Sequence, residues 1–492
     1  MPEPQSSEPK ASQRRKAHQG NRRSCLRAKH GTKGRSRLAR GCDLAALTII
    51  LLVFAGVALV LLSLWQWPAV PILLLVLVAM TPRYSMSVFG VNVNAERFAL
   101  PCVSAALMIR TLASGRGVVR FGWAHVGLGL YLSSLAVSSL LVAPQRSQSL
   151  KLWVLVVIVS SSWWIVCQVV RTPRTLRFTY VAFLIAAVSE AVLGLTMILL
   201  NALTGLNFGL QADSLTGVLT PYASQYEGNT FGSFVAAGVV AWLAWLTMRP
   251  SGQRWRPWEV GVLLVLVAGD LASFSRGAWI ATAAGVLLVA VIAGRIRRWL
   301  TVSIGLSAVG LAVILASGAD GSRLSSGLVT RLASLPSILT GAGSPTRFDQ
   351  SFTQQVILRD LISSPIVGTG AGSLGQRFHY VTQNLPAWNG NLELHVLNDA
   401  GAMGLLGIAI LLLCTAVPLW RLLRKPRSDV DRQVATGSLA MIAVLIVAFQ
   451  ATEATYLSYS WLIFGIAWVA GHPRRATNLA DTAAPCTQIV AP

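Results

Sequence analysis

Residues 258–294, WEVGVLLVLVAGDLASFSRGAWIATAAGVLLVAVIAG, contain two long apolar runs separated by a short polar turn. A helix that crosses a lipid bilayer needs about 20 mostly apolar residues. We therefore predict two membrane spans, at 258–274 and 277–294, with a tight turn at 273–277 between them. Similar runs recur along most of the chain, so the sequence predicts an all-α polytopic membrane protein.

The composition of the whole chain supports this fold class. Its 492 residues are 54% hydrophobic and only 12% charged, whereas soluble domains carry about 25% charged residues. The formal net charge is +23, and much of it lies in residues 1–42, which contain few apolar side chains. We expect a disordered basic tail that stays in the cytoplasm and lies near anionic lipid. Bare charge is a weak motif, so we expect no nucleic-acid partner.

Outward from the quoted stretch, hydropathy predicts further spans on both sides. The candidates are 44–64, 67–82, 98–113, 122–143, 150–170, 178–201, 229–248, 258–274, 277–294, 298–316, 402–421, 434–451 and 454–471. Arginine-rich connections between them and Arg474–Arg475 near the end predict that both termini are cytoplasmic. Two termini on one side require an even number of spans. We therefore expect about 12, with 67–82 and 98–113 in doubt.

The only long polar interruption is 317–400, which we predict to be an extracytoplasmic loop containing short helices. The predicted organisation is a tail at 1–42, transmembrane helices at 43–316, this loop, transmembrane helices at 401–472 and a cytoplasmic tail at 473–492. None of the six cysteines has a partner at metal-binding spacing. We therefore predict no disulfide framework and no zinc site.

Asp270, Ser275 and Arg276 form the first candidate site, at the turn of the quoted stretch. Ionisable residues inside a membrane are costly and usually mark a functional site or a buried pair. The predicted topology puts Arg276 at the outer membrane face, where an isolated arginine is not expected. One interpretation is a guanidinium that binds a phosphate at the membrane surface. The alternative is an arginine that extends to the headgroups and pairs with Asp270.

The second candidate site lies within the long loop. Arg347 precedes a stretch with helical spacing of apolar residues, Arg359 lies within that stretch, and Pro365 ends it. The glycines at 368–372 then predict a tight turn, since the segment lacks the lysine and preceding strand of a nucleotide-binding loop. The alternative for either arginine is a solvated surface charge.

The third candidate site precedes the next predicted span and contains Asn391, Glu393 and His395. A histidine at the mouth of a helix can act as a general base, because its ordinary pKa is near 6.5. Glu393 is a second candidate for that role. The alternative is that His395 only forms hydrogen bonds within the loop.

Together these segments resemble the O-antigen ligase and O-antigen polymerase superfamily of bacterial integral membrane proteins. The resemblance rests on the Ser275-Arg276-Gly277 turn, on an arginine ahead of the 364–370 segment SPIVGTG, and on residues 391–407 entering a span. It covers about 120–407. It implies transfer of a glycan from an undecaprenyl diphosphate carrier to an acceptor sugar hydroxyl outside the cytoplasmic membrane, without a metal or cofactor.

The resemblance also implies roles for individual residues. Arg276 and Arg347 would bind the diphosphate, with Asp270, Ser275, Asn391 and Arg359 in support. The family has a His-Asn pair about ten residues before an acidic-x-Gly motif. Alignment on Asp399 and Gly401 puts Gly390 where that histidine is expected. His395 could replace it; otherwise Glu393 or the geometry of the acceptor alone would serve.

Two other functions remain open from the sequence. A transporter or flippase for lipid-linked saccharides would place basic residues along a path through the membrane. A non-catalytic scaffold for envelope assembly would need no convergence of Arg276, Arg347 and His395. The glycosyltransferase is favoured, with a lipid-linked oligosaccharide donor, a glycan or glycolipid acceptor, membrane lipids and possible envelope-assembly proteins as partners.

Overall fold

The computed structural model describes residues 54–65, 68–81, 83, 85–88, 91–113, 121–212, 217–250, 253–294, 357–360, 362–378, 391–450, 452 and 455–472. The chain divides into two compact units, residues 1–56 with 87–92 and residues 57–86 with 93–492. Nearly all described residues belong to the second unit. The predicted tails at 1–42 and 473–492 and the predicted span 298–316 lie outside the described residues.

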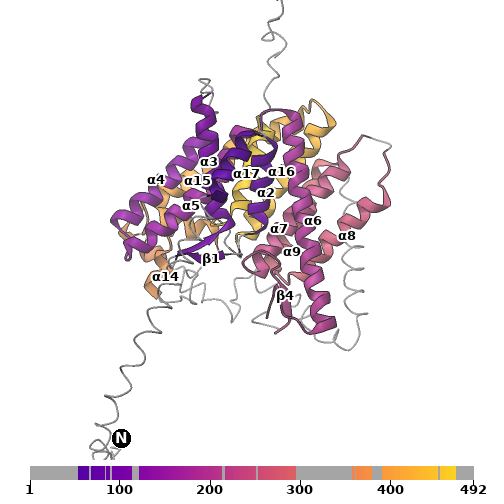
Figure 1. Ribbon diagram of the computed structural model, residues 1–492. Helices are drawn as coiled ribbons and strands as arrows, with labels where there is room; N and C mark the ends of the chain where they lie inside the picture. Colours follow the sequence, from indigo (N-terminus) through magenta and orange to yellow (C-terminus); the bar gives the residue numbers. More distant parts are fainter. Residues whose placement is uncertain are drawn as a thin grey trace, which may run out of the picture. The chain divides into compact units, whose positions relative to one another are not determined.

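The described part of the second unit is mainly helical (Figure 1). Its helices are α2 (Ala69–Met80), α3 (Ala95–Ala113), α4 (Trp123–Leu141), α5 (Arg146–Val169), α6 (Pro173–Thr204), α7 (Gly228–Thr247), α8 (Pro257–Ala272), α9 (Arg276–Ile292), α14 (Ser373–Phe378), α15 (Leu392–Arg424), α16 (Asp429–Ala448) and α17 (Ser458–Gly471). The strands are β1 (Ser85–Val88), β2 (Val91–Asn94), β3 (Leu210–Ala212) and β4 (Leu219–Pro221). β3 pairs antiparallel with β4, with Leu210 opposite Pro221.

Among the described residues, six helices are long and apolar enough to cross a membrane: α4, α5, α6, α7, α15 and α16. Shorter apolar helices are Phe54–Trp65, α2, α9 and α17. The prediction of an all-α membrane protein is confirmed at this level. The doubtful spans 67–82 and 98–113 correspond to α2 and α3, so both are helices. The total of about 12 spans stays a prediction.

Local sequence signals explain where several helices begin and end. Pro173 and Pro257 occupy the first positions of α6 and α8, where the missing N–H has no helical partner to lose. Thr172 caps α6 by accepting from the Thr175 N–H at 3.2 Å. Gly205 ends the same helix with a left-handed φ of 73°.

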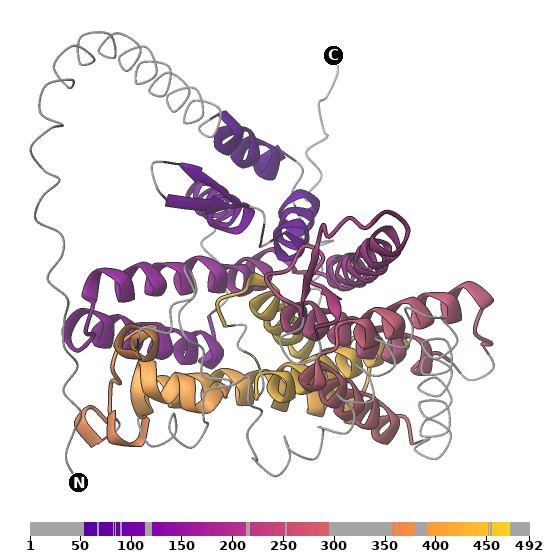
Figure 2. The same cartoon turned by 90° about the horizontal axis from the view of Figure 1, so that it is seen from below.

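Small residues and a buried central helix explain the packing. In Figure 2, α15 (orange to yellow) lies alongside α4 (violet), and the two helices contact each other extensively. A Cβ on Gly127 would lie 2.6 Å from the Gly407 carbonyl oxygen, so only glycine allows this close approach. Helix α17 packs against α5, α15 and α16 and is buried along most of its length. Its apolar character on all sides fits that central position.

Several helices begin at the same end of the bundle, which we call the site end. The Leu392 N–H of α15 donates to the Phe449 carbonyl after α16, at 3.0 Å. Thr452 donates to Glu227, which precedes α7, at 3.1 Å. α8 ends and α9 begins at the turn 273–275, which contacts the first turns of α7. The end of α7 and the start of α8, with Arg249 and Arg256, therefore lie at the opposite end.

Candidate functional site

Asp270 lies near the end of α8, is 4% exposed and bonds across to α9. Its Oδ2 accepts from the Thr282 hydroxyl at 2.7 Å. Its backbone carbonyl accepts from the Trp279 indole N–H at 3.0 Å. Oδ1 has no hydrogen-bond partner among the described residues. The described side-chain partner of the Asp270 carboxylate is therefore Thr282, and its pairing with Arg276 stays a prediction.

The turn between α8 and α9 forms where the sequence predicts it. Phe274 has a φ of 52°, which is uncommon for a residue other than glycine. The Ser273 hydroxyl donates to the Asp270 carbonyl at 2.6 Å and accepts from the Ser275 N–H at 3.1 Å. Ser275 then caps α9 by accepting from the Ala278 N–H at 3.3 Å. Ser275 therefore supports the site by fixing the start of α9.

Arg276 is the first residue of α9 and is only 7% exposed. The N-terminus of a helix carries a partial positive charge and favours anions. The charge of Arg276 and the helix N-terminus would therefore both favour an anion near the start of α9.

Helix α15 is broken at Gly401, which has a φ of 64° and a ψ of −168°. The break separates a short helical segment, 392–400, from the long segment 402–424. A Cβ at Gly401 would lie 2.4 Å from the Ile366 carbonyl oxygen and 2.5 Å from the Gly368 nitrogen. Both the backbone conformation and the space therefore require glycine at this position.

Residues 365–372, which we call the glycine turn, bind the backbone groups at this break. The tight turn predicted at 368–372 is confirmed, with positive φ at Gly368, Gly370 and Gly372. Four backbone hydrogen bonds join it to α15: Thr369 N–H to Asn398 O at 2.7 Å, Gly370 N–H to Asp399 O at 3.0 Å, Ala402 N–H to Pro365 O at 2.9 Å and Met403 N–H to Ile366 O at 3.0 Å. Irregular backbone at membrane depth is stable only when its polar groups are satisfied in this way.

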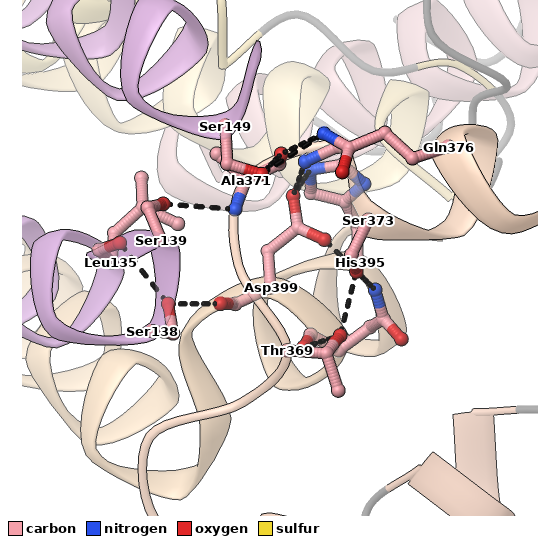
Figure 3. Close-up of polar contacts among 12 residues, drawn as sticks. Leu135, Ser138, Ser139, Ser149, Thr369, Ala371, Ser373, Gln376, His395 and Asp399 are labelled. Carbon is pink, nitrogen blue, oxygen red and sulfur yellow. Dashed lines mark hydrogen bonds and ion pairs between the residues drawn. The ribbon is translucent and has the colours of Figure 1, made fainter. Parts of the chain in front are cut away.

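Buried serines of α4 and α5 complete this network (Figure 3). Ser134 donates to the Ala400 carbonyl at 2.6 Å, and Ser138 donates to the Asp399 carbonyl at 2.7 Å. Ser139 accepts from the Ala371 N–H at 3.1 Å, and Ser149 donates to the Ala371 carbonyl at 2.8 Å. The serines fasten both the break and the glycine turn to the neighbouring helices.

His395 and Asp399 form a buried pair on the short segment of α15. The distance from His395 Nε2 to Asp399 Oδ2 is 3.2 Å, and the two residues are four positions apart. The Asp399 carboxylate also accepts from the Gly372 N–H and from the Asn398 side-chain amide, each at 2.8 Å. The ring of Tyr456 meets the His395 ring edge to face, with centroids 6.0 Å apart.

In the sequence, Asp399 serves only to align the chain with the family motif, and no role is predicted for it. The spacing of His395 and Asp399 was the signal that could have paired them. Residues four apart on a helix share one face.

Asn391 and Glu393 face a different partner from His395. Asn391 caps α15 by accepting from the Leu394 N–H at 2.9 Å and donates to Gln450 Oε1 at 2.7 Å. The Gln450 amide donates to both oxygens of Glu393 at 2.9 Å. Glu393 is exposed, whereas His395 is buried. The two candidate residues of this segment therefore differ in both burial and partner.

Of the two arginines predicted to act in the long loop, the structure describes Arg359. Arg359 is exposed, as expected for a solvated surface charge. Arg347 lies outside the described residues, as does Gly390.

The site end contains two groups of candidate residues. One comprises Asp270, Ser275 and Arg276, and the other comprises Asn391, Glu393, His395 and Asp399. In the second group His395 contacts Asp399 directly, and α16 packs against both α9 and α15. Among the described residues, His, Cys, Asp and Glu do not gather in threes or more around a possible metal ion.

Comparisons with protein-family models and with curated proteins found no match for this chain. The resemblance to O-antigen ligases and polymerases therefore rests on the motifs in the sequence.

Proposed function

We propose that the protein is a glycosyltransferase of the O-antigen ligase and polymerase type, in a bacterial cytoplasmic membrane with both termini cytoplasmic. It would act on the outer side, in cell-envelope or exopolysaccharide biosynthesis. The observation that carries the proposal is the buried Arg276 at the N-terminus of α9, at the same end of the bundle as the buried His395. One residue supplies fixed positive charge and the other can accept a proton.

The chemistry of transfer divides between these residues. Arg276, with Arg347 as its proposed partner, binds the diphosphate and stabilises the negative charge that develops as it leaves. His395 accepts the proton of the acceptor hydroxyl as its oxygen bonds the anomeric carbon. The bond from that carbon to the diphosphate breaks, and undecaprenyl diphosphate is released.

A flippase for lipid-linked saccharides is the second candidate, and the break in α15 favours it. Transporters commonly bind substrates at discontinuous helices whose free backbone groups face the substrate. Here the backbone groups at the break bind the glycine turn and the serines of α4 instead. The break therefore supports the flippase less strongly than Arg276 supports the transferase.

The test is a transfer assay with the full-length protein in nanodiscs. The donor is an oligosaccharide linked to undecaprenyl diphosphate, and the readouts are the lengthened or transferred glycan and the released carrier. Arg276→Ala should lower kcat by about 10²- to 10³-fold, as expected when one charge-stabilising group is removed. Arg174→Ala, which removes an exposed arginine at the start of α6, is the matched control and should retain full activity.

Either of two results would contradict the proposal. The first is a glycan product that persists undiminished in Arg276→Ala. The second is the absence of product with several donors and acceptors while labelled lipid crosses the bilayer, which would identify the flippase.

A further inference from the structure

We propose that Asp399 is a positioning residue for His395, which orients the imidazole and fixes its proton on Nε2. The catalytic meaning of this inference rests on the proposed function. The pairing itself is a statement about the folded protein and can be tested without the reaction.

The geometry of the pair defines the tautomer. Asp399 Oδ2 lies 3.2 Å from His395 Nε2. An ionised carboxylate only accepts hydrogen bonds, so the nitrogen that faces it carries the proton. In a neutral imidazole, Nδ1 is then the unprotonated nitrogen.

The carboxylate can orient the ring because it is itself held by other groups. The Gly372 N–H donates to Oδ2 and the Asn398 amide donates to Oδ1, each at 2.8 Å. The same Asn398 amide donates to the Ser373 hydroxyl at 3.0 Å. Two donors fix the plane of the carboxylate, and that plane then fixes the imidazole.

The break at Gly401 contributes to the position of the Asp399 carboxylate. It allows the glycine turn to dock against the side of α15, which brings the Gly372 N–H to the Asp399 carboxylate. A continuous helix would use its own carbonyls for the N–H groups of 402 and 403, and these instead bind Pro365 and Ile366. The break, the turn and the carboxylate therefore act together on His395.

Asp399 and Tyr456 face the imidazole from two elements. Tyr456, from the connection between α16 and α17, meets the ring edge to face and limits its rotation. Glu393, two residues before His395 on α15, binds Gln450. Among the described residues, the carboxylate that contacts the imidazole is that of Asp399.

The proton and electron pairs balance in the proposed step. The O–H bond of the acceptor breaks, its proton passes to the imidazole of His395, and its oxygen forms the bond to the anomeric carbon. The electron pair of the old glycosidic bond leaves with the diphosphate. His395 becomes an imidazolium, which the Asp399 carboxylate stabilises until the proton is released to water.

The test combines a spectroscopic signature with kinetics. Protein labelled with ¹⁵N-histidine is prepared in nanodiscs, and the His395 signals are assigned by their loss in His395→Gln. The wild type should show the proton on Nε2. In Asp399→Asn, the amide can donate to Nε2, so the proton should move to Nδ1. kcat should fall by about 10²- to 10⁴-fold, the contribution of a general base, with KM for the lipid donor nearly unchanged.

Asp429→Asn is the matched control, because Asp429 is exposed in the first turn of α16. It should alter neither the tautomer nor kcat. A wild-type His395 with its proton on Nδ1 would overturn the proposal even if Asp399→Asn failed to fold. So would an unchanged tautomer in a folded Asp399→Asn. A tautomer that moves as expected, in a protein that transfers no glycan, would support the pairing and reject the glycosyltransferase.

Discussion

The turn between α8 and α9 and the break in α15 both interrupt helices at the site end, but different parts of the chain stabilise them. At the turn, Ser273 and Ser275 bind backbone groups within three residues of themselves. At the break, the partners are the glycine turn, about 30 residues away, and serines of α4, more than 250 residues away. Hydrogen bonds between residues close in sequence position Arg276, whereas contacts between distant parts of the chain position His395 and Asp399.

Gly401→Ala should have the largest effect, because it attacks the tertiary arrangement at its centre. The conformation of Gly401 is nearly exclusive to glycine, and strain of this kind costs about 1–3 kcal/mol. The clash with Ile366 and Gly368 adds an overpacking cost of about 1–3 kcal/mol. We expect poor expression and a strongly lowered Tm in detergent. Size-exclusion chromatography with fluorescence detection, after heating to a series of temperatures, measures both.

Gly129→Ala in α4 is the control for that experiment. A Cβ at Gly129 meets nothing within 4 Å, so the Tm should change little. A Gly401→Ala protein as stable as Gly129→Ala would show that α15 does not need the break.

Gly232→Ala probes the local arrangement and should have the next largest effect. A Cβ at Gly232 would lie 2.7 Å from the Ser273 hydroxyl and 2.9 Å from the Ala278 Cβ, so the turn must move away from α7. We expect a loss of about 1–3 kcal/mol in the free energy of unfolding. If the protein is the proposed glycosyltransferase, a displacement of Arg276 by about 1 Å lowers kcat by up to about 10²-fold.

The control is Gly261→Ala in α8, where a Cβ meets nothing within 4 Å. If Gly232→Ala had a lowered Tm but full transfer activity, the position of the turn would not matter for catalysis.

The same contrast explains what the sequence could predict. The predicted span 277–294 and the predicted turn at 273–277 agree closely with α9 and the observed turn, because apolar length and local capping determine them. The predicted span 402–421 begins ten residues after α15 does. Polar residues such as Asn398 and Asp399 interrupt the apolar run, and their partners are distant in sequence.

The candidate site divides in the same way. Arg276 was predictable from its charge and its place at a turn. The bond from Thr282 to Asp270 and the docking of the glycine turn on α15 were not, because both need the positions of other helices.

Ser134→Ala should weaken the break by a smaller amount. It removes the hydroxyl that donates to the Ala400 carbonyl at 2.6 Å, a hydrogen bond with a net contribution of about 1 kcal/mol. Ser160→Ala is the control, because this equally buried hydroxyl donates within its own helix, to Val157. The difference in Tm between the two variants isolates the contact between helices. Equal values would mean that α4 does not stabilise the break.

Glu393→Gln should have the smallest effect, and it distinguishes the two candidate bases of the α15 segment. Glu393 is exposed, and its described partner is Gln450, which can donate equally well to a side-chain amide oxygen. We expect kcat within about twofold of the wild type, whereas loss of a general base lowers it by about 10²- to 10⁴-fold. His395→Gln, measured in the same assay, provides the opposite expectation. If Glu393→Gln abolished transfer and His395→Gln did not, the base would be the solvent-facing carboxylate. The buried pair of His395 and Asp399 would then only stabilise the structure around the break.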